Sequence, residues 1–147
     1  MRYSRTVPIS EGRDKGKTFV VKEMSAWDAE RWGYRLILAL GRAGVDVEQF
    51  AGQGMAGIAA AGIMAIPALD YRDAAPLLDE METTFFIQEP GVTRPIVRNP
   101  DGEGDDVEEV STCLELRRAF LELHTRFFEK GTPSKDSTSK ETTSPAS

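Results

Sequence analysis

Two residue types with catalytic potential, cysteine and histidine, occur once each in the 147-residue chain, as Cys113 and His124. They lie 11 residues apart in a segment predicted to be one helix, so about 16 Å of helical rise separates them. A nucleophile and its base must lie within hydrogen-bonding distance. We therefore expect Cys113 to be a small core residue and His124 to have a partly buried packing role.

Metal and cofactor sites are not expected either. One Cys and one His are too few for zinc sites built from several cysteines or from histidine pairs. An acidic loop matches a calcium-binding loop in composition only, because the EF-hand ligand pattern is missing. Glycine-rich segments at 11–16 and 52–57 lack the spacing or the preceding strand of nucleotide-binding loops. We expect no catalytic residue, no cofactor, no metal ion and no enzymatic activity. The loop that matches a calcium-binding loop in composition has four acidic residues, Asp101, Glu103, Asp105 and Asp106.

The charge balance argues against nucleic acid as a partner. The chain has 18 Lys and Arg side chains and 24 Asp and Glu side chains, a net charge of −6, and an acidic surface repels phosphate backbones. The charge is uneven, because residues 1–35 carry eight basic and five acidic side chains. A basic end on an acidic body favours head-to-tail self-association, so a homo-oligomer is among the expected partners.

The uncharged segment 49–69 raises the question of a membrane span, which needs about 20 predominantly apolar residues. Four glycines, two glutamines and Pro67 interrupt this segment, and half of its apolar residues are alanine. A tightly packed buried helix is favoured, and no membrane partner is expected. We expect no secretory signal, because no apolar region follows the first charged residues. The single cysteine favours the reducing interior of a cell.

Strand signals occur in two places. Segments 5–9 and 18–24 are partly β-branched and flank a glycine-containing turn, which predicts an N-terminal β-hairpin. Segments 85–88 and 95–98 are also strand-like, and we expect them to form a second short hairpin. The remaining elements are predicted to be helical, so the expected fold is α+β and mostly helical, with three to four helices.

Three of these helices lie between the two predicted hairpins. Helix 26–42 follows Ser25 as its N-cap, and its tryptophans, Trp27 and Trp32, are expected to be core anchors. An alanine- and glycine-rich helix is predicted over 54–66. A third helix is predicted over about 71–83, with Asp70 as its cap; Pro76 either sits early in a helix that begins near Asp73 or kinks the helix. The apolar residues of the first helix recur at three- and four-residue spacing and define one buried face.

The last helix, predicted over 107–130, has an apolar arc of about 200°, wider than the stripe of an ordinary surface helix. Such an arc indicates burial on two sides or contact with a partner. We therefore expect a partner-binding face on this helix, formed by Leu116, Phe120, Leu123, Phe127 and Phe128. After Gly131, residues 132–147 are mostly polar, nine of them Ser or Thr. We expect a folded domain over 1–131 and a disordered tail over 132–147.

Seven short segments, in this order and spacing over residues 5–130, resemble the tail assembly chaperones of long-tailed bacteriophages, the counterparts of the lambda tail chaperone. The segments are GKTFVVKEM at 16–24, AERW at 29–32, LILAL at 36–40, GMAG at 54–57, PLLDEM at 76–81, DVEEV at 106–110 and LHTRFF at 123–128. The polar tail has no counterpart in this resemblance.

The resemblance implies a non-enzymatic function. Such chaperones bind the long tape measure protein, keep it soluble and help to recruit tail tube protein, and many also exist as a longer form made by a programmed −1 frameshift. The resemblance implies action in the host cell cytoplasm and absence from the mature virion. Two alternatives stay open: a structural tail-completion or connector component of the virion, and a small enzyme or ligand-binding protein.

Deletion of residues 132–147 should leave folding intact, because nothing in this segment can pack into a core. We expect the Tm to change by less than about 5 °C, which corresponds to roughly 1 kcal/mol for a domain of this size. Differential scanning calorimetry of the full and truncated chains measures the change. A larger drop would mean that the tail docks on the domain.

Overall fold

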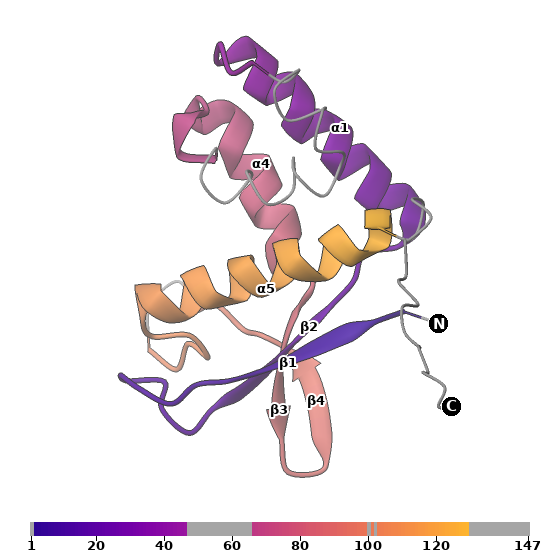
Figure 1. The fold of residues 1–147 in the computed structure, drawn as a ribbon. Coiled ribbons are helices and arrows are strands. Elements are labelled where there is room, and N and C mark those ends of the chain that lie inside the picture. The colour runs from indigo at the N-terminus through magenta and orange to yellow at the C-terminus, as the bar shows by residue number, and fades with distance from the viewer. Residues whose placement is uncertain (1, 47–65, 100, 102, 130–147) are drawn as a thin grey trace, which may run out of the picture.

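The computed structural model describes residues 2–46, 66–99, 101 and 103–129, with side chains up to His124 (Figure 1). The elements follow one another as β1 (Ser4–Pro8), β2 (Thr18–Lys22), α1 (Ala26–Arg42), the short 3₁₀ helix η1 (Ile66–Ala68), α4 (Tyr71–Glu82), β3 (Phe85–Glu89), β4 (Val92–Pro95) and α5 (Val110–Glu129). The predicted helix over 54–66 and the predicted disordered tail lie outside the described residues. None of the described helices combines the length and apolar character that a membrane crossing requires.

The strands form one antiparallel sheet of four, in the order β1-β2-β3-β4. The two hairpins are joined because β2 pairs with β3, with Phe19 opposite Ile87 and Val21 opposite Phe85. The expectation of a mostly helical fold is therefore wrong, since a sheet spanning both hairpins is a principal layer beside the three described α-helices. Each hairpin has a local turn signal, whereas the β2–β3 pairing joins segments more than 60 residues apart and leaves no local signal.

The second hairpin is tighter than the sequence prediction. Its second strand covers Val92–Pro95 instead of 95–98, because Pro90 and Gly91 alone make the turn. Gly91 has a φ of 80°, and proline followed by a glycine with positive φ is the combination that a type II turn requires. The chain therefore reverses at once and pairs over the residues that directly follow.

All three α-helices lie on one side of the sheet (Figure 1). Residues of β2 and β3 alternate accordingly, since Phe19, Val21, Phe85 and Ile87 are buried and the intervening side chains are half-buried. α5 packs on β1 and β2, and α1 packs beside α4. No helix among the described residues covers the other face of the sheet, and there the Lys22 ammonium group lies 4.1 Å from the centre of the Phe86 ring.

Phe120 of α5 lies at the centre of the core and is fully buried. Its ring meets that of Trp32 of α1 edge-on, with 5.1 Å between the ring centres. The indole N–H of Trp32 in turn donates to the Leu77 carbonyl of α4 over 3.1 Å. These two side chains therefore join all three helices, and the prediction of Trp32 as a core anchor is confirmed.

Side-chain caps begin α1 and α4 where the sequence predicts them. Ser25 Oγ accepts from the Asp28 amide over 3.2 Å, and Asp70 accepts from the Arg72 amide over 2.9 Å. α4 thus begins at Tyr71, and the alternative start near Asp73 is wrong. Pro76 is accommodated inside this helix.

The start of α5 is capped from a distance by Asp14, which lies in the turn of the first hairpin. This carboxylate is fully buried and accepts from the amides of Glu108 and Glu109 over 3.1 Å each and from the Lys17 ammonium over 3.0 Å. Burial raises the pKa of Asp14, but hydrogen bonds from Thr112, Lys17 and the two amides outweigh burial, so the pKa is lowered. α5 begins at Val110 and not at 107, and the amides at 108 and 109, just before its first turn, bind Asp14.

A second buried carboxylate continues this network. Asp106 accepts two hydrogen bonds from the Arg94 guanidinium, over 2.8 and 2.9 Å, and one from the Val97 amide over 2.7 Å. Its main-chain carbonyl accepts from Lys17 over 2.9 Å. Hydrogen bonds from Arg94 lower the pKa of Asp106. The segment that leads into α5 is thereby attached to both hairpins.

The variant Asp14→Ala should lower the free energy of unfolding by about 2–4 kcal/mol, because it leaves two amides without their acceptor and Lys17 without one of its two acceptors. Urea denaturation at pH 7 measures this loss. Glu11→Ala, in the same turn but exposed, is the matched control and should change stability by less than about 0.5 kcal/mol. The difference between the variants should shrink as the pH falls below about 3.9, because the stability from a depressed folded pKa is complete above the unfolded pKa and is lost as the pH falls through the folded pKa. Equal stability of both variants at pH 7 would contradict the capping role.

Candidate partner-binding surface

Cys113 and His124 have structural surroundings. Cys113 is half-buried, and burial raises the pKa of its thiol. His124 is buried, and its Nε2 accepts from the Met24 amide over 2.9 Å. Its Nδ1 lies 2.7 Å from the Phe120 carbonyl, so Nδ1 carries the proton and the ring is neutral. Both ring nitrogens are therefore occupied: Nδ1 bonds within α5, and Nε2 joins α5 to the segment that precedes α1.

Acidic and metal-ligating side chains do not converge elsewhere in the described residues, where no group of three or more His, Cys, Asp or Glu is placed to hold a metal ion. The acidic loop instead uses its charges internally. Asp105 accepts from the Asn99 amide, and Asp106 binds Arg94. The described part of the loop therefore forms a hydrogen-bonded turn.

The predicted partner-binding face of the last helix is largely interior. Leu116, Phe120 and Leu123 are 1%, 0% and 5% exposed, so they contribute to the core and present no surface to a partner in this conformation. The wide apolar arc is explained by burial on two sides, with the sheet below and helices α1 and α4 above. Phe127 and Phe128 lie in the last turns of α5, and their side chains are outside the described part.

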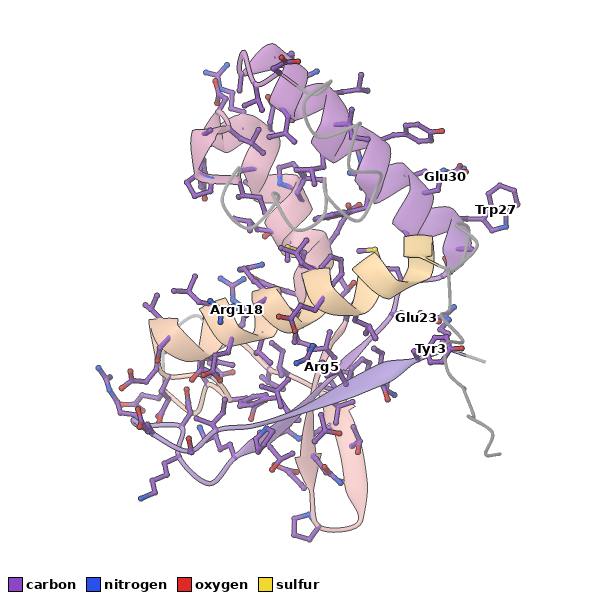
Figure 2. All side chains as sticks on the ribbon, viewed as in Figure 1. Tyr3, Arg5, Glu23, Trp27, Glu30 and Arg118 are labelled. Atoms are coloured by element: carbon purple, nitrogen blue, oxygen red, sulfur yellow. The ribbon has the colours of Figure 1, made fainter. Side chains whose placement is uncertain are left out.

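Among the described elements, α1 exposes the most large apolar side chains. Trp27, Tyr34 and Leu38 are 75%, 61% and 61% exposed. Their spacing of seven and four residues aligns them along one side of the helix, and we call these three residues the α1 ridge. Figure 2 shows the Trp27 side chain pointing away from the body of the molecule. The prediction of Trp27 as a core anchor is therefore wrong.

Helical geometry explains why the ridge faces solvent. The buried face of α1 includes Ala29, Trp32 and Leu36. Trp27 precedes Leu36 by nine residues, which is two and a half helical turns, so the two side chains leave opposite sides of the helix. The sequence already contained this signal, because a tryptophan half a turn out of phase with its helix's apolar face cannot reach the same core.

Arginines line one side of the ridge. Arg35 pairs with Glu80, and Arg42 pairs with Asp73 over 2.7 Å, and both pairs tie α1 to α4. Arg31 has no ion pair within the described residues. A concavity of about 630 Å³ opens beside Tyr34, between the two helices, and is lined by Met24, Asp28, Arg31, Tyr34, Arg35, Glu80 and Thr83. Tryptophan, tyrosine and arginine dominate the binding energy of protein interfaces, so this surface is suited to a protein partner.

Comparison of the chain with protein-family models, with curated proteins and with solved structures finds no match.

His124 should make the domain less stable in mild acid. Its folded pKa is lowered by burial, so the unfolded chain binds a proton more readily once the pH falls below about 6.5. Between pH 7.5 and 5.5 we expect the free energy of unfolding to fall by about 1 kcal/mol from this group, as measured by urea denaturation. His124→Gln keeps a hydrogen-bond acceptor that does not titrate and should lose less over this range. Identical pH profiles for the two proteins would contradict this role for the neutral ring.

Proposed function

We propose that this chain is a non-enzymatic tail assembly chaperone of long-tailed bacteriophages, which binds the tape measure protein and keeps it soluble. The observation that carries the proposal is the α1 ridge, where Trp27, Tyr34 and Leu38 expose three large apolar side chains on one element. The resemblance of seven segments to that family supports the same reading. The proposed place of action is the host cell cytoplasm, with the protein absent from the mature virion.

The α1 ridge suits a long helical partner with exposed apolar faces. An amphipathic helix can lay its apolar face along a row of apolar side chains at helical spacing. Full burial of one such side chain contributes about 1.5–3 kcal/mol, and part of this is lost to ordering both partners. One ridge therefore binds reversibly, which suits a chaperone that must leave the assembled tail.

The charges support solubility of the complex. The net charge of −6 makes neighbouring complexes repel one another, which keeps the bound, aggregation-prone segments apart. The basic excess in residues 1–35 and the acidic excess in the rest allow head-to-tail contacts between copies along one partner. No nucleic acid or membrane is part of the proposal.

Recruitment of tail tube protein is assigned to a longer form of the chain. In the family, a −1 frameshift near the end of the gene replaces part of the C-terminus with a second domain. A polar C-terminal segment can be exchanged in this way without altering the core. The competing proposal, a tail-completion or connector component, places the chain in the finished particle. Mass spectrometry of purified virions separates the two, since a chaperone is missing there.

The double variant Trp27→Asp/Leu38→Asp should reduce the fraction of coexpressed tape measure protein that stays soluble by about fivefold or more. Charged groups on the ridge must be desolvated on binding, whereas both positions are exposed in the folded monomer. The Tm should change by less than about 3 °C. Leu114→Asp is the matched control, because Leu114 is 62% exposed on α5 and outside the ridge. Unchanged tape measure solubility with the double variant, or an equal loss with the control, would contradict this assignment.

A further inference from the structure

The outer edge of β1 has the geometry of a second interaction surface. β1 is the first strand in the sheet order, so no described strand pairs with its outer side. The hydrogen bonds of its inner side determine which residues face outward. The Glu23 amide donates to the Tyr3 carbonyl over 3.0 Å, and the Ile9 amide donates to the Lys17 carbonyl over 3.0 Å.

Along an antiparallel pair of strands, hydrogen-bonded residue pairs alternate with non-hydrogen-bonded pairs. Tyr3, Arg5, Val7 and Ile9 therefore direct their main-chain groups toward β2, and the residues between them direct theirs outward. The outward groups are the N–H and C=O of Ser4 and Thr6 and the C=O of Pro8. An extended chain is the structure that matches this spacing of donors and acceptors.

The opposite edge of the sheet is blocked. In β4 the outward positions are Thr93 and Pro95, and proline has no N–H to donate. Just beyond them, the Val97 amide donates to the Asp106 carboxylate over 2.7 Å, and the Asp106 amide to the Val97 carbonyl over 3.4 Å. The segment leading to α5 thus occupies the main-chain groups next to this edge, whereas β1 has no such cover among the described residues.

A groove of about 320 Å³ runs along the outer edge of β1 beneath α5. It is lined by Arg5, Thr6, Val7 and Pro8 of the strand and by Glu115, Arg118, Ala119 and Glu122 of the helix. Figure 2 shows Arg5 between the strand and α5, and Arg118 farther along the helix toward its start. An added strand would therefore alternate its side chains between this groove and the open face of the sheet.

The geometry of β1 and α5 determines which charged residue of the helix lies beside which residue of the strand. Arg5 pairs with Glu122, and Pro8 and Glu115 line the same groove, so α5 runs antiparallel to β1. Four residues of helix rise by about 6 Å, or nearly two strand residues, which places Arg118 at the level of Val7. Arg118 is exposed and has no ion pair or hydrogen bond within the described residues. The groove therefore has an available positive charge at this level.

We propose that β1 binds an extended segment of a partner protein as a fifth strand, with an acidic side chain opposite Val7 directed to Arg118. Ser4 and Thr6 supply the main-chain hydrogen bonds, and the side chain opposite Arg5 lies beside the Arg5–Glu122 pair. This surface is separate from the α1 ridge and does not depend on the tape measure proposal.

Amide exchange followed by NMR tests the edge directly. In the free, full-length chain the amides of Ser4 and Thr6 should exchange quickly, and those of Arg5 and Val7 slowly. The probe is the blocked octapeptide Lys-Thr-Thr-Val-Asp-Val-Thr-Lys, with Lys in place of Asp as its comparison. Saturation with the Asp peptide should slow exchange at Ser4 and Thr6 by tenfold or more. Slow exchange at these amides in the free protein would overturn the proposal, because the edge would then be occupied already.

Variants test the two halves of the site by fluorescence anisotropy with the same peptides. Thr6→Pro removes only an outward N–H and should weaken binding tenfold or more, whereas Thr6→Ser should stay within about twofold. Arg118→Glu should reverse the preference from the Asp peptide to the Lys peptide, and this result decides the question if Thr6→Pro does not fold. Equal binding of both peptides, no binding at 1 mM peptide, or a dimer of this chain that Thr6→Pro abolishes would each overturn the proposal.

Discussion

The Asp14 carboxylate is the interaction on which the arrangement of sheet and helices depends. It lies in the turn of the first hairpin, yet it accepts hydrogen bonds from the amides at the start of α5, 94 and 95 residues later. Lys17 extends the connection to the Asp106 carbonyl, and Asp106 binds Arg94 of β4. A buried carboxylate is tolerated only when donors surround it, so the two hairpins and the last helix must meet in one arrangement. The apolar core between the sheet and Phe120 then follows from this attachment.

The sequence was informative where a structural signal is local. Ser25 and Asp70 begin helices because a side-chain oxygen satisfies an amide two or three residues away, and such spacing can be read directly. Pairing of β2 with β3 and capping by Asp14 join residues far apart in the chain, and only the folded structure reveals them. In the sequence Asp14 was one acidic residue in a turn, with nothing to distinguish it from Glu11. The single His124 was likewise visible, but its two partners, Met24 and Phe120, follow from packing.

The candidate partner-binding surface illustrates a second limit of prediction from the sequence. Apolar residues of α5 were expected to face a partner because their arc is wide, but the width reflects burial against the sheet and two helices together. Trp27 was expected in the core because tryptophan usually is, although its phase on α1 places it on the opposite side from Leu36. Helical phase was thus more informative than residue type. Knowing which of two apolar faces is covered still requires the neighbouring elements: in the described part of the chain, α4 and α5 lie against one side of α1 and leave Trp27 exposed.

The two interaction surfaces use different physical properties and different parts of the fold. The α1 ridge presents apolar side chains beside arginines, so its contacts depend on the side chains of a partner helix. The β1 edge presents main-chain groups, so its contacts depend on a partner being extended, and Arg118 adds a preference for one charge. α5 supports both without using its own apolar face, since its interior residues hold α1 in place while its outer residues form one wall of the groove. Because Leu116, Phe120 and Leu123 are buried, we place the proposed recognition on the ridge and the edge, where a substitution can alter binding without opening the core.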